Sequence, residues 1–162
     1  MNEWRKSQIL AQEQLAERLL YFLKGNRWAV AFCMDLTFIA HLWDDLFDND
    51  RQRTPCEINA AFIASLVGIP SNPFYLEHIL DLRPLMRNAI LQWQDANVLE
   101  KSDQLHDKHL AFGLRASFLQ IFNYCAYLTG GSDWVNQVGV EMRELYREPL
   151  EDFLQEMEKD NA

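Results

Sequence analysis

Basic residues are scarce in this sequence, in which 15 lysines and arginines stand against 24 aspartates and glutamates, for a formal net charge of −9. Nucleic acids and anionic membranes attract basic surfaces, so this balance argues against non-specific binding to either. We therefore expect no nucleic-acid partner. An acidic protein can still bind a phosphate group locally, through a metal ion or through individual arginines.

Cysteines are also few, with three in the chain and no Cys-x-x-Cys spacing. Cys33 and Cys125 lie in apolar runs and are expected to be buried free thiols. This usage is typical of a reducing compartment, so we expect a cytoplasmic protein. The first residues do not have the pattern of a secretory signal, and charged residues interrupt each apolar run before it could span a bilayer. We therefore expect no membrane insertion.

Strand signals are missing too, because no stretch alternates apolar and polar residues and no Asn-Gly hairpin signal occurs. Apolar residues recur at helical spacing instead. The sequence predicts a single all-α domain over residues 1–162, a helical bundle of about six helices, with the nearly apolar second helix at its centre. The expected helices cover about 2–24, 28–48, 54–67, 72–83, 85–128 (one helix, or two with a break near 102–103) and 132 onwards.

Three local signals fix expected helix ends. Thr54, Pro55 and Glu57 have the order of a capping box with proline at the first helical position. Pro84 should end the fourth helix, since the residue before a proline is disfavoured in helical geometry. In the last helix, which we expect Ser132 to cap, Pro149 should cause a kink.

The most informative stretch is the end of the second predicted helix. His41, Asp44, Asp45 and Asp48 share one helical face, because positions i, i+3, i+4 and i+7 point the same way. Carboxylates this close repel each other unless a cation compensates them. Oxygen ligands suit Mg²⁺, which commonly binds phosphate oxygens as well. The sequence therefore predicts a magnesium site for a small phosphorylated ligand.

Residues beside this stripe could complete such a site. Arg51 and Arg53 follow the aspartates and could bind the phosphates of the ligand as charged, multi-donor groups. Trp43 and Phe47, together with His41, are candidate walls of an apolar pocket. Carboxylates at a helix C-terminus also oppose the helix dipole, at a cost of about 0.3–1 kcal/mol each. That cost favours a functional reason for their position.

The run from Asp44 to Pro55 resembles the first aspartate-rich motif of the trans-prenyl diphosphate synthases, which have the class I terpenoid synthase fold. Asp44, Asp45 and Asp48 match the family's metal-binding aspartates, and Asn49 and Asp50 match the pair that follows. Arg51 and Arg53 correspond approximately to its arginines. The resemblance implies a helical, terpenoid-synthase-like fold and a bound Mg²⁺ that holds an allylic diphosphate.

A second acidic cluster could supply further ligands. Asp103 and Asp107 share a helical face and could form the second carboxylate set of the metal site, opposite the first. Lys101 and Lys108 allow a different interpretation, in which the segment is a solvated face with ordinary ion pairs. Both interpretations stay open at the level of sequence.

Two weaker patterns involve other titratable residues. His41, His106 and His109 could form a histidine-rich metal centre between helices. Four glutamates of the last helix share a face and resemble the acidic helices of all-α nucleotide pyrophosphohydrolases, although a solvent-exposed face explains them better: Glu141, Glu144, Glu148 and Glu151.

Two functions follow from these patterns. The first is Mg²⁺-dependent binding or turnover of a diphosphate-containing ligand, in which the metal would stabilise charge on a diphosphate leaving group. The second is a non-catalytic, acidic helical adaptor, such as a small protein of a virus or mobile element. The second is favoured by a chain about half the usual length of the synthases and by the segment 118–124, which has no aspartate where the family's second motif is expected. A homodimer would supply the missing volume.

Overall fold

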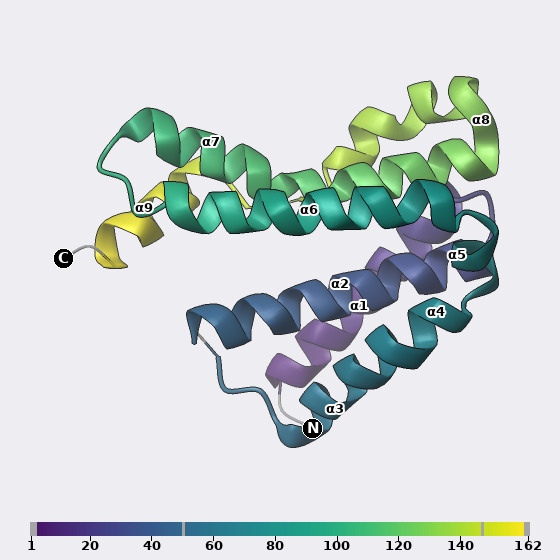
Figure 1. Cartoon of the computed structure of the whole chain (residues 1–162), viewed down its shortest axis with the longest axis horizontal. Coiled ribbons are helices and arrows are strands. Elements are labelled where there is room, and N and C mark those ends of the chain that lie inside the picture. The colour runs from purple at the N-terminus through teal and green to yellow at the C-terminus, as the bar shows by residue number, and fades with distance from the viewer. Residues whose placement is uncertain (1–2, 50, 147, 161–162) are drawn as a thin grey trace. The chain divides into compact units, whose positions relative to one another are not determined.

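The chain folds into helices joined by short connections, as the computed structural model shows (Figure 1). The structure describes the backbone of residues 3–49, 51–146 and 148–160. No strand occurs in these ranges, so the all-α prediction is confirmed, and the number of helices roughly matches the predicted six. Asn2, the predicted start of the first helix, lies outside them. No helix in the described part is long and apolar enough to cross a membrane.

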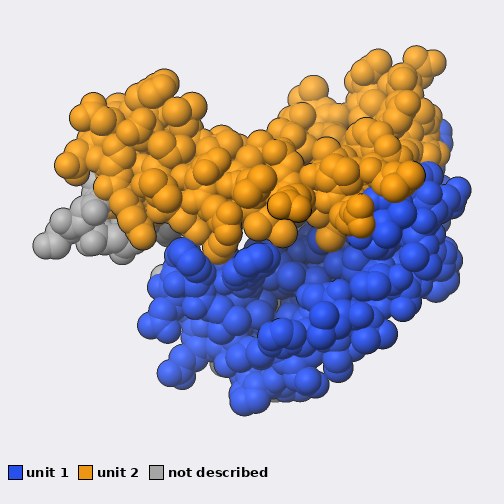
Figure 2. Space-filling view, viewed as in Figure 1, with its two compact units in different colours: residues 1–79 blue, residues 80–162 orange. Residues whose placement is uncertain are grey.

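The helices divide into two compact units, residues 1–79 and 80–162 (Figure 2). The first contains α1 (Glu3–Phe22), α2 (Arg27–Asp48), α3 (Pro55–Ile63), the π-helix η1 (Ala64–Gly68), α4 (Ile69–Ser71) and α5 (Pro73–Glu77). The second contains α6 (Ile79–Leu99, whose first residue belongs to the first unit), α7 (Leu105–Arg115), the 3₁₀-helix η2 (Ala116–Phe118), α8 (Leu119–Arg143) and α9 (Leu150–Asp160). That both units form one domain stays a prediction.

α2 is the central helix of the first unit, since it contacts α1, α3, η1 and α5, and its central place in a bundle of the whole chain stays a prediction. It begins where Asn26 accepts hydrogen bonds from the backbone N–H groups of Trp28 and Ala29, and it ends at Asn49 in the left-handed conformation. Phe32 of α2 stacks on Tyr75 of α5, with the ring centroids 5.6 Å apart. Asn72 caps α5 and donates to the carbonyl of Trp28 at 3.0 Å. These contacts fix α2 within the unit.

The predicted start of α3 is confirmed. Thr54 is its N-cap, Pro55 is its first residue, and Thr54 and Glu57 exchange the two hydrogen bonds of a capping box. The predicted end of the following helix at Pro84 is wrong. α6 starts at Ile79 and contains Pro84, and the chain breaks instead at His78. Pro84 lies in the second turn of α6, past the residues whose N–H groups have no helical partner, so it removes one hydrogen bond of the helix, which nevertheless continues through it.

α6 and α7 are separate helices, and the residues between them include Ser102 and Asp103, which agrees with the second of the two alternatives; the chain changes again at η2, a break that the sequence did not indicate. An ion pair connects the two helices, because Arg115 of α7 donates to the buried Glu100, with one contact at 2.7 Å, and also to Asn97 at 3.2 Å. The sequence places a loop between the expected helices that end at 128 and begin at 132, but the structure has a kink inside α8 there, where Gly131 has φ 78° and ψ −177°. The chain leaves the helix at Arg143 and resumes at α9 just after Pro149, so this proline separates two helices instead of kinking one.

The apolar stripe of the last helices lies inside the second unit. Phe153 of α9 forms a buried cluster with Ala96 and Ala111 of α6 and α7, and further apolar side chains pack around it: Leu99, Phe112, Leu114, Leu150, Leu154 and Met157. These residues of α9 are therefore core residues of the unit.

Candidate functional site

The acidic stripe lies on the last two turns of α2, where helix periodicity places the aspartates close together. Asp44 and Asp45 are half-buried, and Asp48 is exposed. Asp50, which matches the family motif, lies outside the described residues. The short connection from Asn49 to Thr54 then leads directly into the capped start of α3. Two helix ends and their charged residues therefore meet in one place.

Arg53 is the residue that joins these two helix ends. Its guanidinium group forms an ion pair with Asp45 of α2, and its Nη1 lies 3.1 Å from Oε1 of Glu57 in α3. The Arg53 side chain is only 10% exposed. Arg51 also contacts Glu57, at 3.4 Å. In this arrangement the protein's own carboxylates bind the two arginines that the sequence assigns to phosphate.

Glu57 is the carboxylate most strongly affected by this environment. The hydrogen bond from the backbone N–H of Thr54 is the main cause that lowers the pKa of Glu57 to about 2, and the Thr54 hydroxyl and Arg53 add to the effect. Burial acts in the opposite direction. Glu57 is therefore ionised at neutral pH, and its charge helps hold Arg53.

The residues of the candidate pocket lie on the same part of α2. His41 is exposed by its accessible surface. Desolvation by surrounding atoms is nevertheless the main effect on its pKa, which it lowers. Asp44 and Asp45 act to raise this pKa, and Arg53 acts to lower it. Trp43 is 41% exposed and Phe47 is 56% exposed. Apolar surface and carboxylates are thus adjacent here, and the role of these side chains as pocket walls stays a prediction.

The structure does not gather the ligands of a metal site in the part it describes. No group of three or more histidine, cysteine, aspartate or glutamate side chains there is placed to hold a metal ion. Sharing a helical face is therefore not sufficient, because each side chain takes its own direction and Asp45 turns to Arg53. A magnesium ion on Asp44, Asp45 and Asp48 stays a prediction.

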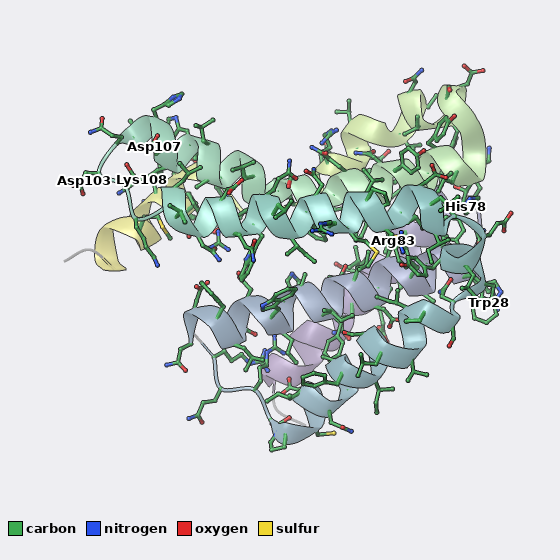
Figure 3. The ribbon with its side chains drawn as sticks, in the orientation of Figure 1. Trp28, His78, Arg83, Asp103, Asp107 and Lys108 are labelled. Atoms are coloured by element: carbon green, nitrogen blue, oxygen red, sulfur yellow. The ribbon has the colours of Figure 1, made fainter. Side chains whose placement is uncertain are left out.

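Asp103 and Asp107 belong to the second unit; Asp107 lies in the first turn of α7, next to Lys108, whereas Asp103 lies in the connection before this helix, so the two do not share a helical face (Figure 3). Asp107 accepts a hydrogen bond from the Ser102 hydroxyl at 2.6 Å, and the same hydroxyl accepts one from the backbone N–H of Gln104. A carboxylate in the first turn also interacts favourably with the helix dipole. Asp107 thus has a local structural role, whereas Asp103 is exposed. Their role as a second carboxylate set stays a prediction.

The remaining candidates are mostly on the surface. His106 and His109 are exposed on α7, and so are Glu141, Glu144 and Glu151. Glu148 is half-buried and accepts a hydrogen bond from the Tyr146 hydroxyl at 2.6 Å. The exposure of the three glutamates agrees with the solvent-face interpretation.

Sequence reasoning missed the apolar outer face of α3 and η1. Four large side chains on this short segment are exposed, namely Phe62 by 60%, Ile63 by 55%, Leu66 by 72% and Val67 by 57%. We call these four residues the α3–η1 face. A signal was present in the sequence, because residues 58–76 include no aspartate, glutamate, lysine, arginine or histidine.

The opposite side of the same segment, which packs on α2, has small residues. Ala61 is buried, and a Cβ atom built on Gly68 would lie 3.4 Å from Oδ2 of Asp35 in α2. Burial raises the pKa of that aspartate. Apart from the half-buried Ile58, the large apolar residues of the segment thus lie outside and small residues lie inside.

Comparisons with known proteins add no family to this description, since no protein-family model, no curated protein and no solved structure matches the chain.

Proposed function

We propose that this chain is a helical interaction protein that binds a partner through the α3–η1 face. The observation that supports this proposal is the inverted packing of the segment, which turns Phe62, Ile63, Leu66 and Val67 away from α2. A helix that only completes a core places its large apolar residues inward. Contiguous exposed apolar residues are instead typical of interaction sites.

The energetics favour a covered face. Full burial of a valine, leucine, isoleucine or phenylalanine side chain is worth about 1.5–3 kcal/mol relative to full exposure. The four side chains of the face are each more than half exposed, so a partner that covers them recovers a large part of that free energy. This gain opposes the cost of association, which is on the order of 4–15 kcal/mol.

The same face determines how a partner is recognised. Because residues 58–76 carry no charged side chain, the face offers no ion pair, and the partner is selected by shape and apolar contact. The acidic end of α2 then has a structural role, since Arg53 fixes the connection that leads into α3.

A fluorescent dye that binds apolar surface tests the proposal in dilute solution. We expect the native chain to bind the dye and Leu66→Ser to bind it clearly less, because this change removes the most exposed side chain of the face. Val98→Ser is a matched control, since Val98 of α6 is also 72% exposed but lies outside the face. Equal dye binding by all three proteins would contradict the proposal.

Binding of a diphosphate through Mg²⁺ is the second candidate function. It is supported by the concentration of Asp44, Asp45, Arg51 and Arg53 at one end of α2. A ligand that binds only the folded chain raises its melting temperature by mass action. Stabilisation by Mg²⁺ and pyrophosphate together, seen with the native chain and lost in Asp44→Ala/Asp48→Ala, would favour this function over docking.

A further inference from the structure

We infer that the partner of the α3–η1 face is a second copy of this chain, which pairs with the first through the same four residues. This inference rests on the proposed docking function and specifies its partner. The charge distribution, the shape of the segment and the area of the face each support it.

The charge distribution limits where two copies can touch. Each copy has a formal net charge of −9, so most approaches place like charges together. Charges separated by more than a Debye length, about 8 Å at physiological salt, are largely screened. Contact through a segment without charged side chains keeps the acidic residues of the two copies apart, and residues 58–76 form such a segment.

Two acidic residues near the segment, Glu57 and Asp35, do not point to a partner of opposite sign. Glu57 lies in the first turn of α3 and is held by Thr54 and Arg53. Asp35 lies on the inner side, against Gly68. The face itself contains no carboxylate that could pair with a basic partner. A second copy of the face is also uncharged and therefore needs no such pair.

The shape of the segment allows self-pairing. Phe62 and Leu66 are four residues apart, as are Ile63 and Val67, so the side chains form two parallel rows. The wider π-helical turn of η1 keeps residues four and five apart on one side. Rows of this kind on one helix pack into the grooves of an equivalent helix. A twofold axis then places the same residues of both copies in one interface.

The exposed area predicts a weak dimer. Four large side chains, each more than half exposed, amount to an apolar patch on the order of several hundred Å², the size of the largest patch on a typical monomer, which is often functional. Two such faces would bury roughly 1,000 Å² in total, near the lower limit for specific interfaces. The dimer should therefore form and dissociate with protein concentration.

Thiol labelling at the face tests the inference, combined with sedimentation to measure mass. In a Cys56→Ser/Val67→Cys chain the new thiol lies in the face, and the two remaining cysteines, Cys33 and Cys125, are buried. We expect the labelling rate to fall at least about fivefold over a hundredfold rise in concentration, as a dimer covers the thiol by mass action. Sedimentation should show dimers over the same range.

Variants show whether the same face is responsible. Adding Leu66→Asp should abolish the dimer and keep labelling fast at all concentrations, because it places a charge in the centre of the face. Adding Val98→Asp, at an equally exposed residue outside the face, should leave both results unchanged. Circular dichroism checks that each variant remains helical.

The outcomes separate this inference from the docking function. A monomer that is labelled fast at every concentration would overturn self-pairing and leave the face open to another partner. A thiol that is labelled slowly at every concentration, with or without Leu66→Asp, would overturn both proposals, because the face would then be covered within one chain. A dimer that persists in Leu66→Asp would overturn self-pairing through this face.

Discussion

Arg53 determines the structure of the acidic end of α2. Its side chain is 10% exposed and contacts Asp45 eight residues earlier as well as Glu57 four residues later. The capping box of Thr54 and Glu57 was predictable, because its signal lies within four consecutive residues. The pairing of Arg53 with Asp45 was not, since it depends on the path of the connection between α2 and α3. The residue types alone fit a phosphate ligand equally well.

Removing this arginine should destabilise the first unit. Arg53→Ala leaves two partly buried carboxylates without their shared cation, and we expect the free energy of unfolding to fall by about 1–3 kcal/mol. Chemical denaturation measures this value. Arg87→Ala, at an exposed position of α6, should change it by less than about 0.5 kcal/mol. Equal effects of the two substitutions would show that the Arg53 contacts contribute little.

Glu57 predicts how stability depends on pH. Its pKa is about 2 in the folded chain against an ordinary value of 4.5, so the folded state favours the ionised form. The stability it contributes is fully present above pH 4.5 and is lost as pH falls towards 2. We expect the free energy of unfolding to fall less steeply in that range for Glu57→Gln than for the native chain. The exposed Glu77 supplies the control, Glu77→Gln, which should keep the native slope.

At the scale of elements, α8 shows why a glycine pair was misread as a loop. Gly131 has a positive φ that only glycine adopts easily. The residues before and after it are nevertheless helical. A Cβ atom on Gly130 would clash with the Trp134 side chain, so this position must also be small. The sequence indicated a break correctly. Whether the chain turns away or continues after a break depends on packing that local signals do not specify.

Two glycine substitutions should have opposite effects on stability. Gly131→Ala should lower the free energy of unfolding by about 1–3 kcal/mol, through backbone strain alone, because no atom lies within 4 Å of the added Cβ. Gly113→Ala in α7 should raise it by about 0.4–1 kcal/mol, since this site is helical and equally open. Thermal or chemical unfolding measures both. A stabilising Gly131→Ala would contradict the kink geometry.

The α3–η1 segment shows a further limit at this scale. Helical periodicity predicts which residues share a side, and the sequence indicated correctly that 54–67 is helical. Periodicity does not say which side faces the core. Here the small residues face α2, which reverses the usual rule that large apolar residues are buried. Only the packing against a neighbouring helix could reveal this inversion.

For the whole molecule, composition and periodicity were sufficient to predict an all-α chain, because these properties are sums over many residues. The prediction of a metal site depended on the directions of three side chains, which a helical wheel leaves open. No group of three or more histidine, cysteine, aspartate or glutamate side chains among those described is placed to hold a metal ion, and a magnesium site stays a prediction. Recognition through the apolar α3–η1 face is our proposal, and it rests on the exposure of the four side chains of that face.

The free energy of unfolding of Leu66→Ala tests this central claim most directly, measured by chemical denaturation in dilute solution. If the face is open, Leu66 contributes little to the fold, and the account predicts a change within about 0.5 kcal/mol of the native chain. Leu19→Ala, at a fully buried residue of α1 in the same unit, should cost about 2–5 kcal/mol. A loss of similar size in Leu66→Ala would contradict the account, because it would place Leu66 in the core.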